Sequence, residues 1–364
     1  MRKKIMLASH SFHTSAIETM KNESSYSTKI IQYLRRKIFG RSYDILDKLI
    51  EAFDQHPVCP EVLYLGDSTV FRVSNDDEDK RSTSDMLAEY FRGTYRVLEL
   101  SHGAYHLEIF YHLLRILKRM RHRPRLIILP INMRSFSPQW YLRPSWQFRA
   151  EIELLVRYYS GHTHTRHYKK HKYSKYQDAY EKKPVHFPLS EIRTIGEFED
   201  IRLSHSSSKV QQDRRTRELF IYFYLYPISE EHPLLIKLRE ILSLAKILNC
   251  KIMAYITPIN IVAARRNVGR EFDIYFSKNL NVVSDVFEKE NSRVITELEI
   301  INIDFLNDSA ICLDYSRGFG SDYFFHDQSI DDHLNQKGRR LISNSVGAAA
   351  IKWLEKEQPV EIGN

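Results

Sequence analysis

Residues 62–70 read VLYLGDSTV, an apolar run that stops at Gly66-Asp67-Ser68. Four apolar residues in succession predict a short strand that is covered on both faces, as in a parallel sheet. A serine at the end of such a strand lies where the chain turns toward the next helix, so its hydroxyl is exposed and its N–H lies near the helix N-terminus. Ser68 is therefore a candidate nucleophile. The plainer alternative is that Asp67 or Ser68 only caps the next helix.

Strands and helices alternate along most of the chain. Strands are predicted at residues 62–65, 96–100, 125–131, 251–256 and 310–314, and helices at 83–91, 107–120, 232–248, 281–298 and 338–357. Such alternation predicts an α/β fold with three layers, α/β/α (flavodoxin-like), around a mostly five-stranded parallel sheet. Ligands of such sheets bind at the carboxyl ends of the strands.

The predicted organisation has two parts. Residues 1–58 form an N-terminal helical segment, with helices expected at 28–39 and 43–53 from apolar residues at three- and four-residue spacing. Residues 59–364 form the main domain, which a large insertion interrupts at about 134–231. The candidate site must therefore be assembled from residues on both sides of the insertion.

Two more predicted strands end in residues that can donate hydrogen bonds. Gly103 follows the second strand, and a glycine there lets the backbone approach a ligand and present its N–H. Asn132 follows the third strand, and its amide can donate to a developing oxyanion. An ordinary turn at Gly103 and a strand-ending hydrogen bond at Asn132 are the alternatives.

A candidate base lies near the C-terminus, in the stretch DDHLNQKG that begins at Asp331. An imidazole pKa near 6.5 would let His333 take a proton from Ser68 and later deliver it to a leaving group. Such a base needs a carboxylate to fix its tautomer, and Asp331 and Asp332 are the candidates. We favour Asp331, because Asp332 is adjacent to His333 and the side chains of adjacent residues tend to diverge. Alternatively, the two aspartates cap the final helix and His333 is a surface residue.

Together these segments resemble the SGNH/GDSL hydrolase superfamily. The resemblance covers residues 61–140 and 251–357, and the stretch NMRSFSPQW from Asn132, with TPIN at 257–260, is similar to uncharacterised bacterial members. There is also a faint similarity to proteins that handle D-alanine esters on teichoic acids. The resemblance implies a Ser-His-Asp triad with Ser68 as nucleophile and His333 as base, and an oxyanion hole completed by Gly103 and Asn132.

The sequence departs from the superfamily pattern at two places. The usual Asp-x-x-His ending would put the acid at position 330, where this chain has Ile330, so Asp331 or Asp332 must serve. Asn132 is followed by Met133 rather than by the aspartate of the common Gly-x-Asn-Asp form. Asp67 and Asn260 are the further candidate substrate-binding residues, a turn-forming role being the alternative for Asn260.

The positive charge is concentrated in the insertion. The net charge is +8, and residues 162–183 contribute +5 of it, with seven Lys/Arg against two Asp/Glu. Tyrosines alternate with these basic residues, a pattern that can bind an anionic polymer, nucleic acid included, or an anionic membrane surface. The alternative is a solvated basic segment. The histidines at 162–171 have no nearby carboxylate or thiol and lie among cations, so no metal site is expected.

Composition limits the remaining classes. No run of about 18 uncharged apolar residues and no signal peptide is evident, which predicts a cytoplasmic protein, peripheral at the inner membrane face if the basic segment binds lipid. No Gly-rich phosphate loop or carboxylate cluster is present, so no cofactor is expected.

Two function classes follow from these observations. The first is a serine-dependent ester hydrolase or O-acyltransferase that acts on an acylated carbohydrate or other small ester through an acyl-enzyme. The second is a non-catalytic polyanion- or glycan-binding protein on the same fold.

Overall fold

The computed structural model describes residues 42–139, 141, 148–161, 180–204, 208–290, 292–296, 308–327, 330 and 332–355. The chain divides into two compact units, Met1–Glu51 and Ala52–Asn364. In the first unit the described helix is α2 (Ser42–Ile50), and a π-helix, η1 (Glu51–Gln55), follows it. These two elements occupy the helix predicted at 43–53, and the helix predicted at 28–39 lies outside the described residues.

Six parallel strands form one sheet in the second unit. They are β1 (Val62–Gly66), β2 (Val97–Ser101), β3 (Leu126–Ile131), β4 (Lys251–Ile256), β5 (Arg293–Thr296) and β6 (Ala310–Asp314), in the spatial order β2-β1-β3-β4-β6-β5. Each of the five predicted strands matches an observed strand to within one residue at either end. The predicted α/β class with a parallel sheet is confirmed.

The sixth strand corrects the sequence analysis. A helix was expected over 281–298, but helix α13 (Glu271–Lys289) ends before β5 begins. The segment that follows α13 contains Val294, Ile295 and Thr296, and β-branched residues favour an extended backbone over a helix. Because β5 is only four residues long, at the edge of the sheet, its alternation was too brief to separate it from the preceding helix.

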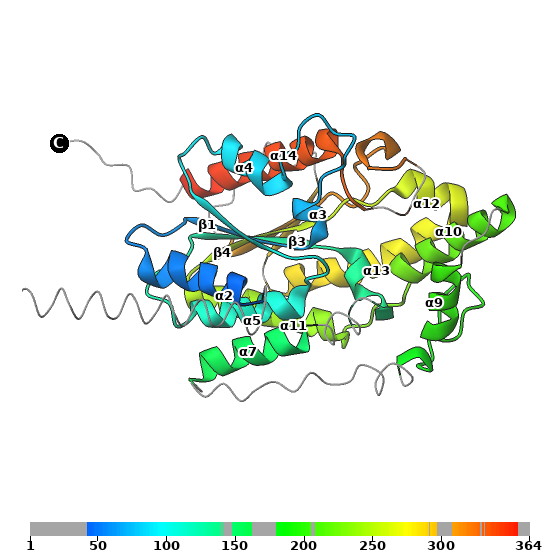
Figure 1. Ribbon diagram of the computed structural model, residues 1–364, viewed down its shortest axis with the longest axis horizontal. Helices are drawn as coiled ribbons and strands as arrows, with labels where there is room; N and C mark the ends of the chain where they lie inside the picture. The colour runs from blue at the N-terminus through cyan, green and yellow to red at the C-terminus, as the bar shows by residue number, and fades with distance from the viewer. Residues whose placement is uncertain are drawn as a thin grey trace, which may run out of the picture. The chain divides into compact units, whose positions relative to one another are not determined.

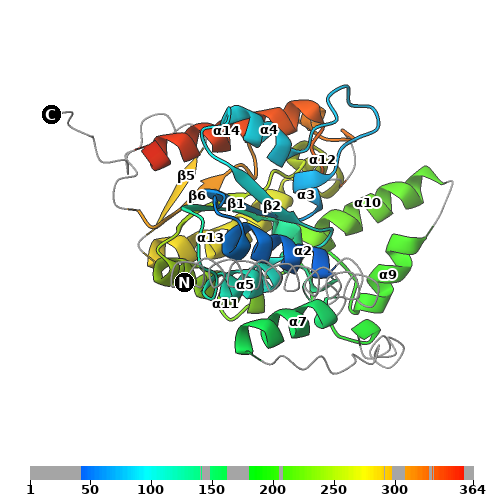
Figure 2. The same cartoon turned by 60° about the vertical axis from the view of Figure 1, so that its left-hand side comes forward.

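Helices cover both faces of the sheet (Figures 1 and 2). On one face lie α4 (Thr83–Tyr90) and α14 (Gln336–Glu355), and on the other lie α5 (Leu107–Leu117), α11 (Pro233–Leu248) and α13. The core beneath α14 includes Tyr64, Ile128, Met253 and Trp353, all at most 1% exposed. Every residue of β1 and β3 is buried, which explains their continuous apolar sequences, and the helices on both faces confirm the three-layer architecture.

The insertion is mostly helical where it is described. It contains the 3₁₀ turn η2 (Met133–Phe136) and helices α7 (Arg149–Ser160), α9 (Ile195–Leu203) and α10 (Lys209–Tyr224). The buried amide of Asn279, on α13, donates to the carbonyls of Tyr224 and Tyr226 at 3.0 and 2.8 Å and accepts from the N–H of Ile228. These bonds fasten the end of α10 to the main domain.

The order of the strands places a topological switch point at the end of β1. The chain passes from β1 to β2 on one side and then returns to β3 on the other, so the connections after β1 and β3 leave the sheet in opposite directions. Ligands of open α/β sheets bind at such a switch point. Short elements border this edge: α3 (Ser68–Phe71), α12 (Ile261–Val268) and η4 (Ser321–Tyr323). Among the described helices, none has the length and apolarity that crossing a membrane requires.

Candidate active site

Ser68 begins α3 immediately after β1. A Cβ atom on Gly66 would lie 2.7 Å from Cγ2 of Val70 and 3.1 Å from Cβ of Ser101, so the turn out of the strand accommodates only glycine. Asp67 caps α3, its Oδ1 accepting the N–H and the hydroxyl of Thr69 at 2.8 and 2.6 Å. The capping role expected as an alternative for Asp67 is therefore present, and it holds Ser68 at the first position of the helix.

His333 lies against this serine. Its Nε2 is 3.0 Å from Oγ of Ser68, a hydrogen-bonding distance between residues 265 positions apart in the chain. The imidazole is 6% exposed, its ring stacks on that of Phe325, and its backbone carbonyl accepts the N–H of Phe325 at 3.0 Å. The nucleophile–base pair expected from the sequence is thus brought together, with the base held from two sides.

Asp332 supplies a buried carboxylate on the other side of the imidazole. Its Oδ1 lies 3.6 Å from Nδ1 of His333, within ion-pair range but longer than a hydrogen bond. The same oxygen accepts from Nη1 of Arg134 at 3.3 Å, and Oδ2 accepts from the amide of Asn132 at 3.0 Å. Asp331, the other candidate acid, lies outside the described residues.

Asn132 joins two carboxylates. Its Oδ1 accepts the N–H of Arg134, and its Nδ2 donates to Asp67 Oδ2 and to Asp332 Oδ2, each at 3.0 Å. An amide nitrogen carries two hydrogens, and both are used by these carboxylates. Asn132 could therefore donate to an oxyanion only by releasing one of them. The strand-ending hydrogen bond expected as the alternative is also made.

The backbone N–H groups of Ser68 and Gly103 are candidates for binding an oxyanion. Within the described residues, neither Ser68 N–H nor Gly103 N–H has a protein acceptor. The loops that carry them are joined by a hydrogen bond from His102 N–H to the Gly66 carbonyl at 3.2 Å. A Cβ atom on Gly103 would meet nothing within 4 Å, so the backbone there borders open space. The next residue, Ala104, has a φ of 66°, a left-handed conformation uncommon for alanine.

Burial raises the pKa of acidic groups close to the candidate nucleophile. Burial raises the pKa of Asp67, and the charge of Asp332 adds to this, while hydrogen bonds from Thr69 and Asn132 oppose it. Beneath Asp67, the hydroxyls of Tyr64 and Tyr255 lie 2.8 Å apart, and burial raises the pKa of both phenols. Near Asp67, the two phenols therefore stay protonated and hydrogen-bonded to each other.

Asn260 caps a helix and binds a neighbouring loop. It is 2% exposed, its Oδ1 caps α12 through the N–H of Ala263, and its Nδ2 donates to the carbonyl of Asp327 at 3.0 Å. These bonds correspond to the turn-forming role expected as the alternative. A contact between Asn260 and substrate stays a prediction.

Arg134 was not predicted from the sequence as a site residue, although it follows Asn132 by two residues. Its guanidinium reaches Asp332, and its Cζ lies 4.1 Å from the ring centroid of Phe223 on α10. The only sequence signal was its place just beyond the end of a strand.

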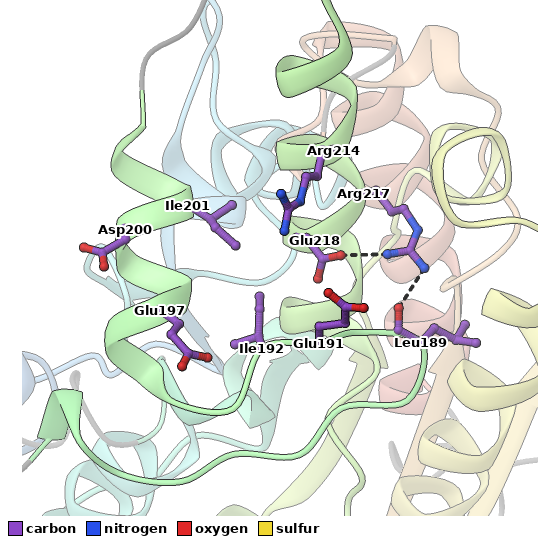
Figure 3. Close-up of a pocket in the computed structure, with 9 residues that line it drawn as sticks. All are labelled: Leu189, Glu191, Ile192, Glu197, Asp200, Ile201, Arg214, Arg217 and Glu218. Atoms are coloured by element: carbon purple, nitrogen blue, oxygen red, sulfur yellow. Dashed lines mark hydrogen bonds and ion pairs between the residues drawn. The ribbon is translucent and has the colours of Figure 1, made fainter.

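Away from Ser68 and His333, the described part of the chain contains a cavity but no cluster of metal ligands. Among the described residues, no group of three or more His, Cys, Asp or Glu side chains could hold a metal ion, and the histidines at 162–171 lie outside those residues. A cavity of about 730 Å³ lies between α9 and α10 and contains none of the triad residues (Figure 3). There the side chains of Arg217 and Glu218 bind each other at 2.7 Å.

Comparison with known proteins adds no family assignment, because no family model matches the chain and no curated protein is significantly similar to it.

Proposed function

We propose that this protein is a serine-dependent ester hydrolase or O-acyltransferase of the SGNH type. The observation that carries the proposal is the 3.0 Å contact between Ser68 Oγ and His333 Nε2 at the switch point of a parallel sheet. A hydroxyl that donates to a neutral imidazole is the arrangement that activates serine as a nucleophile. The superfamily resemblance supports the same roles for the same residues.

In the proposed reaction, Oγ of Ser68 attacks the ester carbonyl while Nε2 of His333 takes the hydroxyl proton. The N–H groups of Ser68 and Gly103 stabilise the tetrahedral oxyanion, and the Asp332 carboxylate stabilises the imidazolium. His333 then protonates the leaving alkoxide, which leaves an acyl group on Ser68. Water, or a sugar hydroxyl deprotonated by His333, attacks this acyl-enzyme and restores the serine. The resemblance favours an acylated carbohydrate as substrate.

The test is covalent labelling. The protein is incubated with a fluorophosphonate probe, the labelled peptide is identified by mass spectrometry, and p-nitrophenyl acetate hydrolysis is followed in parallel. We expect one label on Ser68, and we expect Ser68→Ala to abolish labelling and to lower hydrolysis by about 10⁴-fold. Ser74→Ala, in the loop after α3, is the control and should leave both unchanged. A protein that neither labels at Ser68 nor shows Ser68-dependent turnover is not this enzyme.

A further inference from the structure

Arg134 connects the insertion to the candidate triad. Its side chain, 19% exposed, extends from η2 and donates from Nη1 to Oδ1 of Asp332 at 3.3 Å. Its guanidinium lies over the ring of Phe223, with Cζ 4.1 Å from the ring centroid. Phe223 is 2% exposed and lies on α10, whose end is fastened to the main domain by Asn279. The guanidinium is thus held between the carboxylate and the insertion.

This position matters because two carboxylates are buried close together. Asp67 and Asp332 are 7% and 3% exposed and accept hydrogen bonds from the same amide nitrogen of Asn132. Two neighbouring buried carboxylates disfavour each other's charged form, and a nearby cation offsets that cost. A planar guanidinium stacked on an aromatic ring keeps one orientation, which a lysine ammonium on a flexible stem does not.

We infer that Arg134, held by Phe223 of the insertion, is a positioning residue that fixes the Asp332 carboxylate beside His333, so that the insertion is part of the catalytic machinery. The inference rests on the proposed function. It adds a role for two residues that the superfamily resemblance does not assign.

Loss of the Arg134 charge should change the pH dependence of Ser68 labelling. Among the residues that the structure describes, the charged or titratable groups near Asp332 are Asp67 from the turn after β1, Arg134 from η2 and His333 from its own segment. The phenols of Tyr64 and Tyr255 interact with Asp67 in turn. Removing the arginine leaves these groups without its positive charge, so the site takes up a proton more easily. Because the base must be unprotonated to react, the acidic limb of the activity profile moves to higher pH.

The experiment measures the second-order rate of fluorophosphonate labelling of Ser68 between pH 5 and 9. For Arg134→Gln we expect a rate about 10- to 100-fold below wild type at pH 7, smaller than the loss of about 10⁴-fold for a triad residue. We also expect the acidic limb to rise by about one pH unit. Arg134→Lys should return the limb to within about half a unit of wild type while the rate stays reduced. Phe223→Leu should shift the limb in the same direction by a smaller amount.

The control is Arg115→Gln. Arg115 also stacks on an aromatic ring of the insertion, with Cζ 4.6 Å from the centroid of Tyr159 on α7, but it contacts no triad residue. The Arg115→Gln variant should leave the rate of Ser68 labelling and the acidic limb of its pH profile unchanged. End-point stoichiometry counts the correctly folded sites in each variant.

Three outcomes would overturn the inference. If Arg134→Gln labels with the wild-type rate and limb, the arginine has no positioning role, while the proposed function stands. If Arg134→Gln lowers only the number of labelled sites and the remaining sites keep the wild-type limb, its role is structural alone. If the wild-type protein itself does not label at Ser68, the proposed function fails and the inference fails with it.

Discussion

Asp332 places a carboxylate oxygen 3.6 Å from Nδ1 of the residue that follows it, His333. The side chains of adjacent residues usually point apart, which is why the sequence analysis favoured Asp331. Here the two side chains are held from different sides, Asp332 by Asn132 and Arg134, and His333 by Phe325. Neighbours in sequence can serve as acid and base when separate elements hold each of them.

The identity of the triad acid is the first prediction. Asp332→Asn removes the negative charge that stabilises the imidazolium, so we expect Ser68 labelling to slow by about 10³- to 10⁴-fold. Asp331→Asn, which changes the neighbouring residue in the same way, should slow it by less than about tenfold. The measurement is the labelling rate at pH 7. If the two effects are reversed, the acid is Asp331, as the sequence analysis favoured.

Asn132→Ala should lower stability and activity together. The variant leaves Asp67 and Asp332 buried without the amide that joins them, so we expect a decrease of about 1–3 kcal/mol in the free energy of unfolding. Turnover should fall by about 10²-fold, because the Asp332 carboxylate loses the amide that holds it near His333. Urea denaturation and p-nitrophenyl acetate hydrolysis are the measurements. Unchanged stability with lost turnover would mean that Asn132 serves the oxyanion alone.

Two glycine substitutions should differ in their effect on stability. Because a Cβ atom on Gly103 meets nothing within 4 Å, Gly103→Ala should fold with wild-type stability while its methyl group intrudes on bound substrate. We expect kcat/KM to fall by about 10- to 100-fold. Gly66→Ala places its methyl group 2.7 Å from Val70 and should also lower the melting temperature. A Gly103→Ala variant with full turnover would remove this backbone from the oxyanion hole.

The sequence predicted those strands that a short stretch of neighbouring residues is enough to identify. Short, mostly apolar segments located five strands to within one residue, and the residues after β1, β2 and β3 were expected to share one edge of the sheet, as they do. Parallel topology accounts for this success, because it brings the carboxyl ends of all strands together. The pairing of Ser68 with His333 followed from the same argument.

What the sequence did not reveal depends on contacts between distant segments. The stacking of Arg134 on Phe223 joins residues 89 positions apart through an insertion whose placement no local pattern indicates. The two hydrogen bonds from Asn132 to carboxylates depend on the close approach of three loops. The strand β5 was missed because its four residues follow a helix almost directly.

Stability should decrease below neutral pH because His232 is buried as the neutral form. Its Nδ1 accepts the N–H of Leu234, its Nε2 donates to the carbonyl of Phe136, and burial lowers its pKa to about 4. Below pH 6.5, His232 binds a proton in the unfolded chain but not in the folded protein. The free energy of unfolding that neutral His232 contributes above pH 6.5 is therefore lost progressively as the pH falls toward 4. This one residue should cost about 1.5 kcal/mol between pH 6.5 and 5.

Replacing this residue should flatten the dependence. His232→Asn keeps a helix-capping side chain but cannot titrate, so urea denaturation at pH 6.5 and 5 should show a difference about 1.5 kcal/mol smaller than in the wild type. His186→Asn, at an exposed position, is the control and should keep the wild-type difference. An unchanged difference in His232→Asn would show that His232 is not the group responsible.

The last prediction concerns the support behind the base. Arg339, on α14, is fully buried and donates to Asp77 at 2.7 Å and to the carbonyl of Leu334, the residue after His333, at 2.9 Å. Arg339→Leu leaves the Asp77 charge buried without its partner, so we expect a loss of about 3–5 kcal/mol in the free energy of unfolding. It should also slow Ser68 labelling in the molecules that remain folded, because the segment carrying the base loses an anchor.

The neighbouring arginine provides the comparison. Arg340 pairs with Asp79 and Glu89, but its side chain is 40% exposed, so Arg340→Leu should cost at most about 1 kcal/mol and leave the labelling rate unchanged. Both variants are measured by urea denaturation and by labelling at pH 7. If Arg339→Leu costs no more than Arg340→Leu, the buried pair does not hold the segment that carries His333. In that case the stacking of Phe325 and the hydrogen bond to its N–H would have to position the imidazole on their own.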